Sequence, residues 1–245
     1  MPPVPASARL AYLAVWLLVA GLILLPILAG LWVTLRLAYG VSPALTGAQP
    51  GVWAFAEFAA IPGIWRSVLL SAWTGGAATL LSLLLAAAVL IHGWAWLERG
   101  GGRRWLVPIL AAPHAALALG LVFLLAPSGW IARAIAPVAG WAWPPDVASV
   151  QDPVGLALIL AMTVKEVPFL VFMGLSALTR LPVRGDLAAA RALGYAPHVA
   201  WCTVVLPRLW PMIRLPVMIV LAFGLSVVDM ALILGPSAPP TLAVV

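Results

Sequence analysis

Three charged side chains fall inside long apolar stretches of the sequence. Lys165 and Glu166 are adjacent, near the middle of the stretch 154–178, and Asp229 lies toward the end of the stretch 212–234. A charge at the centre of a bilayer costs about 2.5–3.5 kcal/mol on insertion scales, so such residues normally face a partner charge or a water-filled path. Adjacent helical residues point about 100° apart, so Lys165 and Glu166 cannot share one face. We predict that one of them pairs across to another helix, with Lys165 to Asp229 as the expected pair, and that the other borders a translocation path. A purely structural ion pair between two helices is the alternative.

Residue types that bind metals or form covalent intermediates are scarce and scattered. Cys202 is the only cysteine, and His92, His114 and His198 lie far apart in the sequence. This pattern predicts neither a disulfide within the chain nor a metal site. An intramembrane enzyme needs a convergent set, such as a serine facing a histidine or two facing aspartates. The apolar stretches offer only serines for such a set: Ser71, Ser82, Ser176 and Ser226. We therefore expect that this chain is not an enzyme.

The composition places these residues in a membrane protein. Of the 245 residues, 64% are hydrophobic and 8% are charged, whereas a soluble domain has about a quarter charged residues. Side chains that face lipid remove the difficulty of solvating such a surface. The same numbers exclude intrinsic disorder. The formal net charge of +6 is typical of basic cytoplasmic loops in membrane proteins, and we expect no nucleic-acid partner.

The apolar stretches predict an all-α bundle of about five transmembrane helices. A helix needs about 20 apolar residues to cross a bilayer, and continuous apolar runs lack the alternation of a membrane barrel. We treat residues 1–245 as a single transmembrane domain. The expected spans are 10–35, 67–91, 105–125, 154–178 and 212–234.

The distribution of arginines predicts a cytoplasmic N-terminus. In that orientation three arginines, at positions 36, 66 and 133, fall on the outer side. Nine fall on the cytoplasmic side: Arg9, Arg99, Arg103, Arg104, Arg180, Arg184, Arg191, Arg208 and Arg214. Cytoplasmic loops carry the excess of basic residues, so this asymmetry favours the N-in arrangement, with outer loops at 39–66 and 126–153.

The cytoplasmic loop 179–211 is far longer than the connection of about 2–8 residues that two antiparallel helices need. Asp186 is expected as the N-cap of a short helix from Leu187 to Leu193. Gly194 suits the left-handed position after that helix. Pro197 suits the first turn of a second short helix that ends at Pro207. A loop of this length and order is expected to bind a partner.

These loop residues resemble the EAA motif of permease subunits in binding-protein-dependent type I ABC importers. That motif runs Glu-Ala-Ala, three residues, Gly, and then a stretch ending in Leu-Pro. The matching positions are Ala188, Ala189, Ala190, Gly194, Leu206 and Pro207, and Asp186 and Arg191 complete the expected docking loop. The resemblance extends over roughly residues 60–245, but only the loop is specific. The fused two-half permeases of thiamine-like and ferric-iron importers are the most similar, and the end of the sequence at Val245 fits the N-terminal half of such a chain.

The resemblance implies a mechanical function. The short helix of the loop would dock on a cytoplasmic ABC ATPase, which binds ATP and Mg while this chain carries no cofactor. Further expected partners are a second permease half, a periplasmic or extracellular solute-binding protein, and membrane lipid; the expected location is a bacterial inner membrane. Ala188 departs from the motif because it replaces the acidic residue, so the charged contact to the ATPase is either lost or taken over by Asp186.

Two other interpretations stay open at this stage. The loop 179–211 is alternatively an interfacial segment whose arginines bind anionic headgroups. The chain is alternatively an ion-coupled secondary transporter that uses Lys165, Glu166 and Asp229, although this gives no role to the loop. The sequence does not identify the transported solute.

Overall fold

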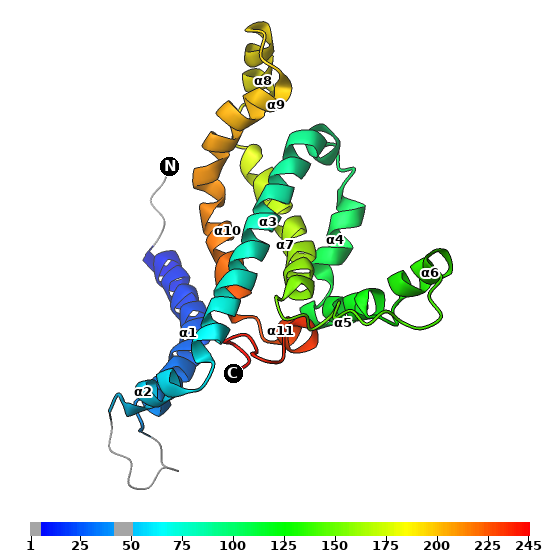
Figure 1. The fold of residues 1–245 in the computed structure, drawn as a ribbon. Coiled ribbons are helices and arrows are strands. Elements are labelled where there is room, and N and C mark those ends of the chain that lie inside the picture. Colours follow the sequence, from blue (N-terminus) through cyan, green and yellow to red (C-terminus); the bar gives the residue numbers. More distant parts are fainter. Residues whose placement is uncertain (1–5, 42–50) are drawn as a thin grey trace. The chain divides into compact units, whose positions relative to one another are not determined.

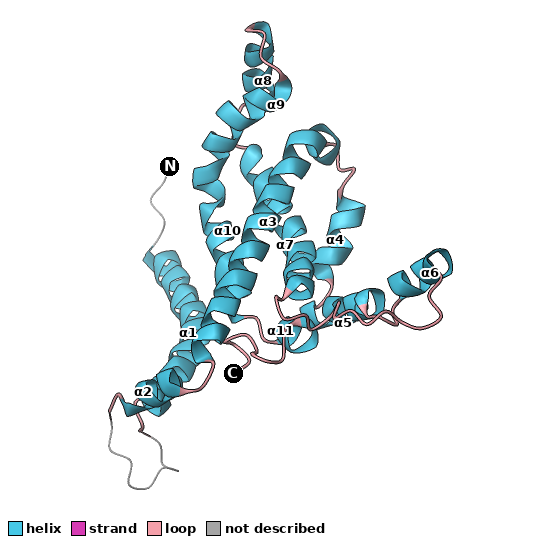
Figure 2. Cartoon of the chain, viewed as in Figure 1, coloured by secondary structure: helices cyan, strands magenta, loops and turns pink. Residues whose placement is uncertain are grey.

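The structure is a computed structural model that describes residues 6–41 and 51–245. Residues 42–50, part of the expected outer loop 39–66, lie outside the described residues. Within the described ranges the chain forms helices, turns and loops and no strand (Figure 2). The chain divides into two units, Met1–Pro62 and Gly63–Val245, which are described separately. The predicted all-helical fold is confirmed.

The first unit contains α1 (Ala6–Ala38) and α2 (Trp53–Ala60). At about 1.5 Å per residue, the 33 residues of α1 exceed the roughly 30 Å core of a bilayer. Gly40 turns the chain after α1 with φ +73°, and a Cβ at this position would lie 2.8 Å from the Trp53 indole. Tyr39 and Phe55 meet edge to face at 5.6 Å. These contacts fold α2 back onto the end of α1.

The second unit is built around α3 (Ile64–Glu98), α7 (Leu156–Leu178) and α10 (Leu206–Ser226), which lie side by side in Figure 1. Gly75 and Gly224 let α3 and α10 approach closely, because a Cβ on Gly75 would lie 2.9 Å from the Gly224 backbone. Small residues at such crossings are typical of membrane helices, which gain stability from close packing.

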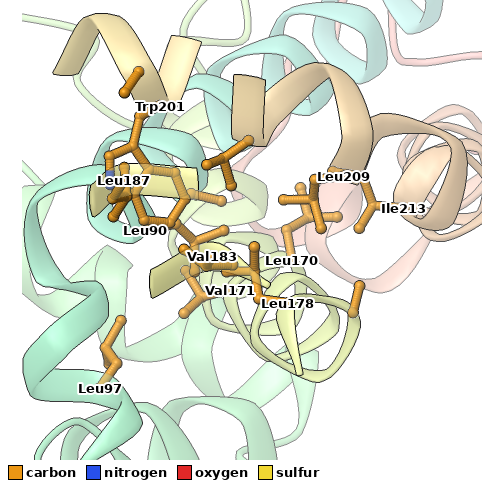
Figure 3. Close-up of a cluster of buried hydrophobic side chains, with 14 of the residues drawn as sticks. Leu90, Leu97, Leu170, Val171, Leu178, Val183, Leu187, Trp201, Leu209 and Ile213 are labelled. Carbon is orange, nitrogen blue, oxygen red and sulfur yellow. The ribbon is translucent and has the colours of Figure 1, made fainter. Parts of the chain in front are cut away.

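Two apolar clusters fill this unit. One lies toward the end of α3 and α7 that carries α8 (Val183–Ala192), and Figure 3 shows its side chains. Its members include Leu90, Leu170, Leu178, Trp201 and Leu209. The other cluster lies around the start of α7 and includes Leu158, Met162, Met230 and Leu234. Both ends of the unit are therefore packed, and α8 is part of the packed structure.

The structure corrects the expected third span 105–125. This region forms two helices, α4 (Arg103–Ala111) and α5 (His114–Leu125), and the nine residues of α4 are too few to cross a bilayer. Pro113 causes the break, because it has no N–H to donate to the carbonyl of Ile109 four residues earlier. The apolar segment that is long enough to span is instead His114–Ala139, where α5 is followed after a short turn by α6 (Trp130–Ala139).

The structure also corrects the expected fifth span 212–234. A continuous helical segment runs from Pro197 to Ser226, and it contains α9 (Pro197–Ala200), a π-helical turn (Trp201–Val205) and α10. The helix ends where Val227 takes an extended conformation, with ψ 126°, and a short α11 (Asp229–Leu234) follows. Two adjacent β-branched valines and an aspartate favour this break, since all three residue types are poor helix formers. The remaining expected spans lie within or nearly within α1, α3 and α7, and the described residues contain five helical segments long and apolar enough to cross a membrane.

Candidate functional site

Lys165 holds the end of the broken helix α4. Its ammonium, on α7, donates hydrogen bonds to the carbonyl oxygens of Ile109 at 3.0 Å, of Leu110 at 2.8 Å, and of Ala112. The last carbonyls of a helix lack partners within the helix, and a positive charge is favourable at this end of the helix dipole. The side chain is 5% exposed, and an ammonium group has three N–H donors. All three N–H donors of Lys165 therefore bind backbone carbonyls at the end of α4, next to the break at Pro113.

Glu166, the next residue, is buried in a different way. It is 8% exposed, and among the described residues its carboxylate has neither a hydrogen bond nor an ion pair. It lines a pocket of about 320 Å³. Buried ionisable groups in a membrane normally face a partner or a water-filled cavity. Glu166 faces a cavity.

Three ring side chains share this pocket with Glu166. They are Phe169 on α7, His114 at the start of α5, and Phe223 on α10. The rings of His114 and Phe223 lie 4.6 Å apart at an angle of 39°. Phe169 follows Glu166 by three residues, so helical spacing already places it on the same side of α7. His114 and Phe223 come from distant parts of the sequence, and no local signal connects them to Glu166.

The expected ion pair between Lys165 and Asp229 is not formed. Backbone carbonyls hold the ammonium of Lys165, and the Asp229 carboxylate accepts a hydrogen bond at 2.9 Å from the backbone N–H of Met230, at the start of α11. Asp229 is exposed and does not line the pocket of Glu166. Of the three charged residues singled out from the sequence, the structure brings only Lys165 and Glu166 to one pocket.

The loop between α7 and α10 forms a second candidate site at one end of the unit (Figure 1). Its first helix, α8, begins at Val183, so the expected N-cap role of Asp186 is wrong. Asp186 lies in the first turn, where negative charge is favourable, and its carboxylate pairs with Arg208 at 2.5 Å. Two apolar side chains of α8, Val183 and Leu187, are buried in the adjacent cluster. Packing therefore extends the helix by one turn before Leu187.

The end of α8 follows the expected pattern. Gly194 has φ +84°, a conformation that costs glycine little. The N–H of Gly194 donates to Arg191 at 2.9 Å, and the N–H of Tyr195 donates to Ala190 at 3.0 Å. These two bonds form a Schellman motif, which satisfies carbonyls at the helix end. Pro197 then occupies the first turn of α9, as its type predicts.

The tip formed by α8 and α9 presents small and apolar side chains to its surroundings. Ala188, Ala189 and Arg191 are exposed, whereas Ala190 is buried against the cluster. Leu193 is 76% exposed and Tyr195 is 56% exposed. An exposed apolar surface rimmed by polar residues is typical of an interaction site.

Leu206 and Pro207 do not end a helix, contrary to expectation. They form the first turn of α10, directly after the π-helical turn. In that turn the N–H of Leu206 donates to Trp201, five residues earlier. Proline lacks the N–H that a regular helix would donate to Thr203, and a widened turn accommodates such a residue. The loop and the last span are thus one helical segment.

A second ion pair ties the loop to α3. Arg184 of α8 and Glu98 at the end of α3 lie 3.0 Å apart. The turn after α3, with Arg99, and the start of α4, with Arg104, therefore lie at the same end of the unit as α8 and α9, as Figure 1 also shows.

No protein-family profile matches the chain. The chain is 30% identical, over 185 residues and 76% of its own length, to a protein of Escherichia coli (strain K12) named inner membrane ABC transporter permease protein YnjC. The matched stretch is 34% of that protein, so the chain spans about a third of the length of this relative. The all-helical fold and the five apolar segments agree with such a protein. The chain is thus similar to an ABC transporter permease, as the resemblance drawn from the sequence predicts.

Proposed function

We propose that this chain is a membrane-spanning permease subunit of an ATP-driven ABC importer in a bacterial inner membrane. It forms part of a solute path and docks a cytoplasmic ATPase through α8 and α9. The ATPase binds the ATP and Mg, and this chain contributes no cofactor. The similarity to YnjC supports the ABC permease class. The import direction, a second permease half and a solute-binding protein belong to the proposal.

The observation that carries the docking role is the exposed apolar tip. Leu193 and Tyr195 project from a tip whose backbone is fixed by a Schellman motif. Side chains that are exposed and apolar on an ordered segment lose little entropy on binding. Asp186 pairs with Arg208 and Arg184 pairs with Glu98, both within the chain. Asp186 is therefore not free to replace the acidic residue of the motif in a charged contact to the ATPase. The tip contact is instead chiefly apolar.

The second supporting feature is mechanical continuity. The segment from Pro197 to Ser226 is helical without interruption, and α10 is anchored on α3 through Gly75 and Gly224. A displacement of the tip by the ATPase is therefore transmitted along α10 to Phe223 in the pocket of Glu166. Rigid helices are effective carriers of such coupling.

The proposed orientation places the tip in the cytoplasm. The arginines of the turn after α3 and those of α8 and α10 gather at one end of the second unit. Basic residues favour the cytoplasmic side, which puts the N-terminus inside if α1 crosses once.

The test is affinity purification of the tagged full reading frame in mild detergent, with mass spectrometry of the proteins that co-purify. Leu193→Asp is the variant, because it places a charge on the exposed tip without touching the core. Cys202→Ser is the matched control, because Cys202 is exposed in the π-helical turn after α9, outside the tip surface. We expect an ABC ATPase with the parent and the control, and at least a tenfold loss with Leu193→Asp. Absence of an ATPase from all three samples contradicts the proposal.

The ion-coupled secondary transporter is less well supported. It needs Lys165, Glu166 and Asp229 to act together, and Asp229 does not line the pocket that contains the other two. It also leaves the ordered, exposed tip without a role.

A further inference from the structure

The pocket beside Glu166 offers a solute an unusual set of groups. Glu166 is 8% exposed as a residue, and among the described residues its carboxylate has neither a hydrogen bond nor an ion pair. Burying an ionised carboxylate without a partner is costly, and a buried charge whose partner is missing destabilises a protein. A group so placed gains stability from any bound species that brings a positive charge or N–H donors.

Lys165 does not donate a hydrogen bond to the Glu166 carboxylate. Although it lines the same pocket, its ammonium donates to three backbone carbonyls and has no N–H donor left. An anionic solute would therefore find a positive charge without a free hydrogen bond and would also meet the Glu166 carboxylate. A cationic solute would also meet the positive charge of Lys165, but it would find two unused acceptor oxygens on Glu166.

The rest of the wall suits the apolar body of a cation. Phe169 and Phe223 border the pocket together with His114, and aliphatic side chains of α4 and α10 complete it. The face of an aromatic ring attracts a cation, with a contribution that grows when water is excluded. The pocket volume of about 320 Å³ lies at the lower end of the range for ligand pockets, about 300–1,000 Å³. It accommodates a small molecule.

We propose that this pocket binds a small organic cation with N–H donors, whose charged nitrogen contacts the Glu166 carboxylate and whose apolar part packs against Phe169 and Phe223. The inference rests on the proposed function, since a solute-binding pocket is meaningful in a permease. It goes beyond that function because it names the class of solute.

Binding of three size-matched probes to the full chain in lipid nanodiscs tests this directly. The probes are radiolabelled benzylammonium, benzyl alcohol and benzoate, which share a ring but carry positive, zero and negative charge. We expect saturable benzylammonium binding at least tenfold tighter than that of benzyl alcohol, and no saturable benzoate binding. Equal binding of the three probes, or a preference for benzoate, overturns the proposal without any variant.

Variants then locate the site. Glu166→Gln keeps the shape of the side chain but removes its charge, and we expect at least a tenfold loss of benzylammonium affinity. Asp146→Asn is the matched control, because this carboxylate is exposed and outside the pocket, and it should leave the affinity within twofold. Phe223→Leu serves as a second pocket variant, with an expected loss of about threefold. Unchanged affinity in monodisperse Glu166→Gln protein contradicts the assignment, and if that variant does not fold, unchanged affinity in Phe223→Leu does so.

The outcome is separable from that of the ATPase experiment. Selective cation binding without a co-purifying ATPase would sustain the pocket and overturn the proposed permease coupling. A co-purifying ATPase with no preference for benzylammonium would sustain the coupling and overturn the solute class.

Discussion

Pro113 and Pro207 each deny a helix one backbone N–H donor, yet the two regions around them differ in structure. At Pro113 the helix breaks into α4 and α5, and the ammonium of Lys165 takes up the freed carbonyls. At Pro207 the helix widens into a π-helical turn and continues as α10. The first region gains a buried charge and a pocket, whereas the second keeps the tip continuous with a span. The outcome of a proline in these two helices therefore depends on which group satisfies the carbonyls that it leaves free. A lysine side chain does so after the break at Pro113, and a widened turn accommodates Pro207 without a break.

The largest effect is expected for Lys165→Met, which removes the group that holds the break at Pro113. Three backbone carbonyls would then lose a partner in apolar surroundings, and each unsatisfied group costs about 1–3 kcal/mol. We expect the free energy of unfolding in mixed micelles to fall by about 3–5 kcal/mol. Denaturant titration measures this change. Arg214→Met is the control, because Arg214 is exposed on α10, and it should change the value little. A similar small change for both variants would mean that the carbonyls do not depend on Lys165.

The second effect concerns the continuous helix α10, which must stay anchored on α3 to transmit movement. Gly75→Ala places a Cβ 2.9 Å from the Gly224 backbone and should destabilise the chain by about 1–3 kcal/mol through overpacking. Gly76→Ala is a neighbouring control with no atom within 4 Å of the added Cβ. It should stabilise α3 by about 0.5–1 kcal/mol. The same denaturant titration measures both, and equal signs would contradict the close crossing.

A double-mutant cycle sharpens the role of Pro113. Pro113→Ala supplies an N–H that can donate to the Ile109 carbonyl, which is one of the three held by Lys165. In the Lys165→Met background we therefore expect Pro113→Ala to restore about 1 kcal/mol. In the parent background the same change should restore nothing. Additive effects in the cycle would show that the proline and the lysine act independently.

The smallest effects are expected for the two ion pairs beside the second region. The pair of Asp186 with Arg208 is less exposed than that of Glu98 with Arg184, so Asp186→Asn should cost up to about 1 kcal/mol and Glu98→Gln less than about 0.5 kcal/mol. Repeating the titrations at high salt should reduce both differences. A larger loss for Glu98→Gln would reverse the expected order.

The sequence predicted the features that depend on local residue type. The all-helical membrane fold followed from the apolar runs, and the left-handed Gly194 and the start of α9 at Pro197 followed from turn chemistry. The start of α8 did not, because the burial of Val183 and Leu187 extended the helix past Asp186. The partners of Lys165 were also missed, since the carbonyls of α4 become free only through a break at Pro113. His114 and Phe223 meet only in the folded chain, and no spacing in the sequence indicates their contact.

The most direct test of the account is whether ATP bound by the docked ATPase changes the pocket beside α10. Ile219 lines the pocket, and Leu215 is exposed on the same helix but does not line it. Each is replaced by cysteine in a Cys202→Ser background, which removes the only native cysteine. Thiol labelling is then followed in the complex with its co-purified ATPase, with and without ATP and vanadate. The account predicts a labelling rate at Ile219→Cys that changes at least threefold with nucleotide, while that at Leu215→Cys stays constant. An unchanged rate at Ile219→Cys would contradict the transmission of movement along α10.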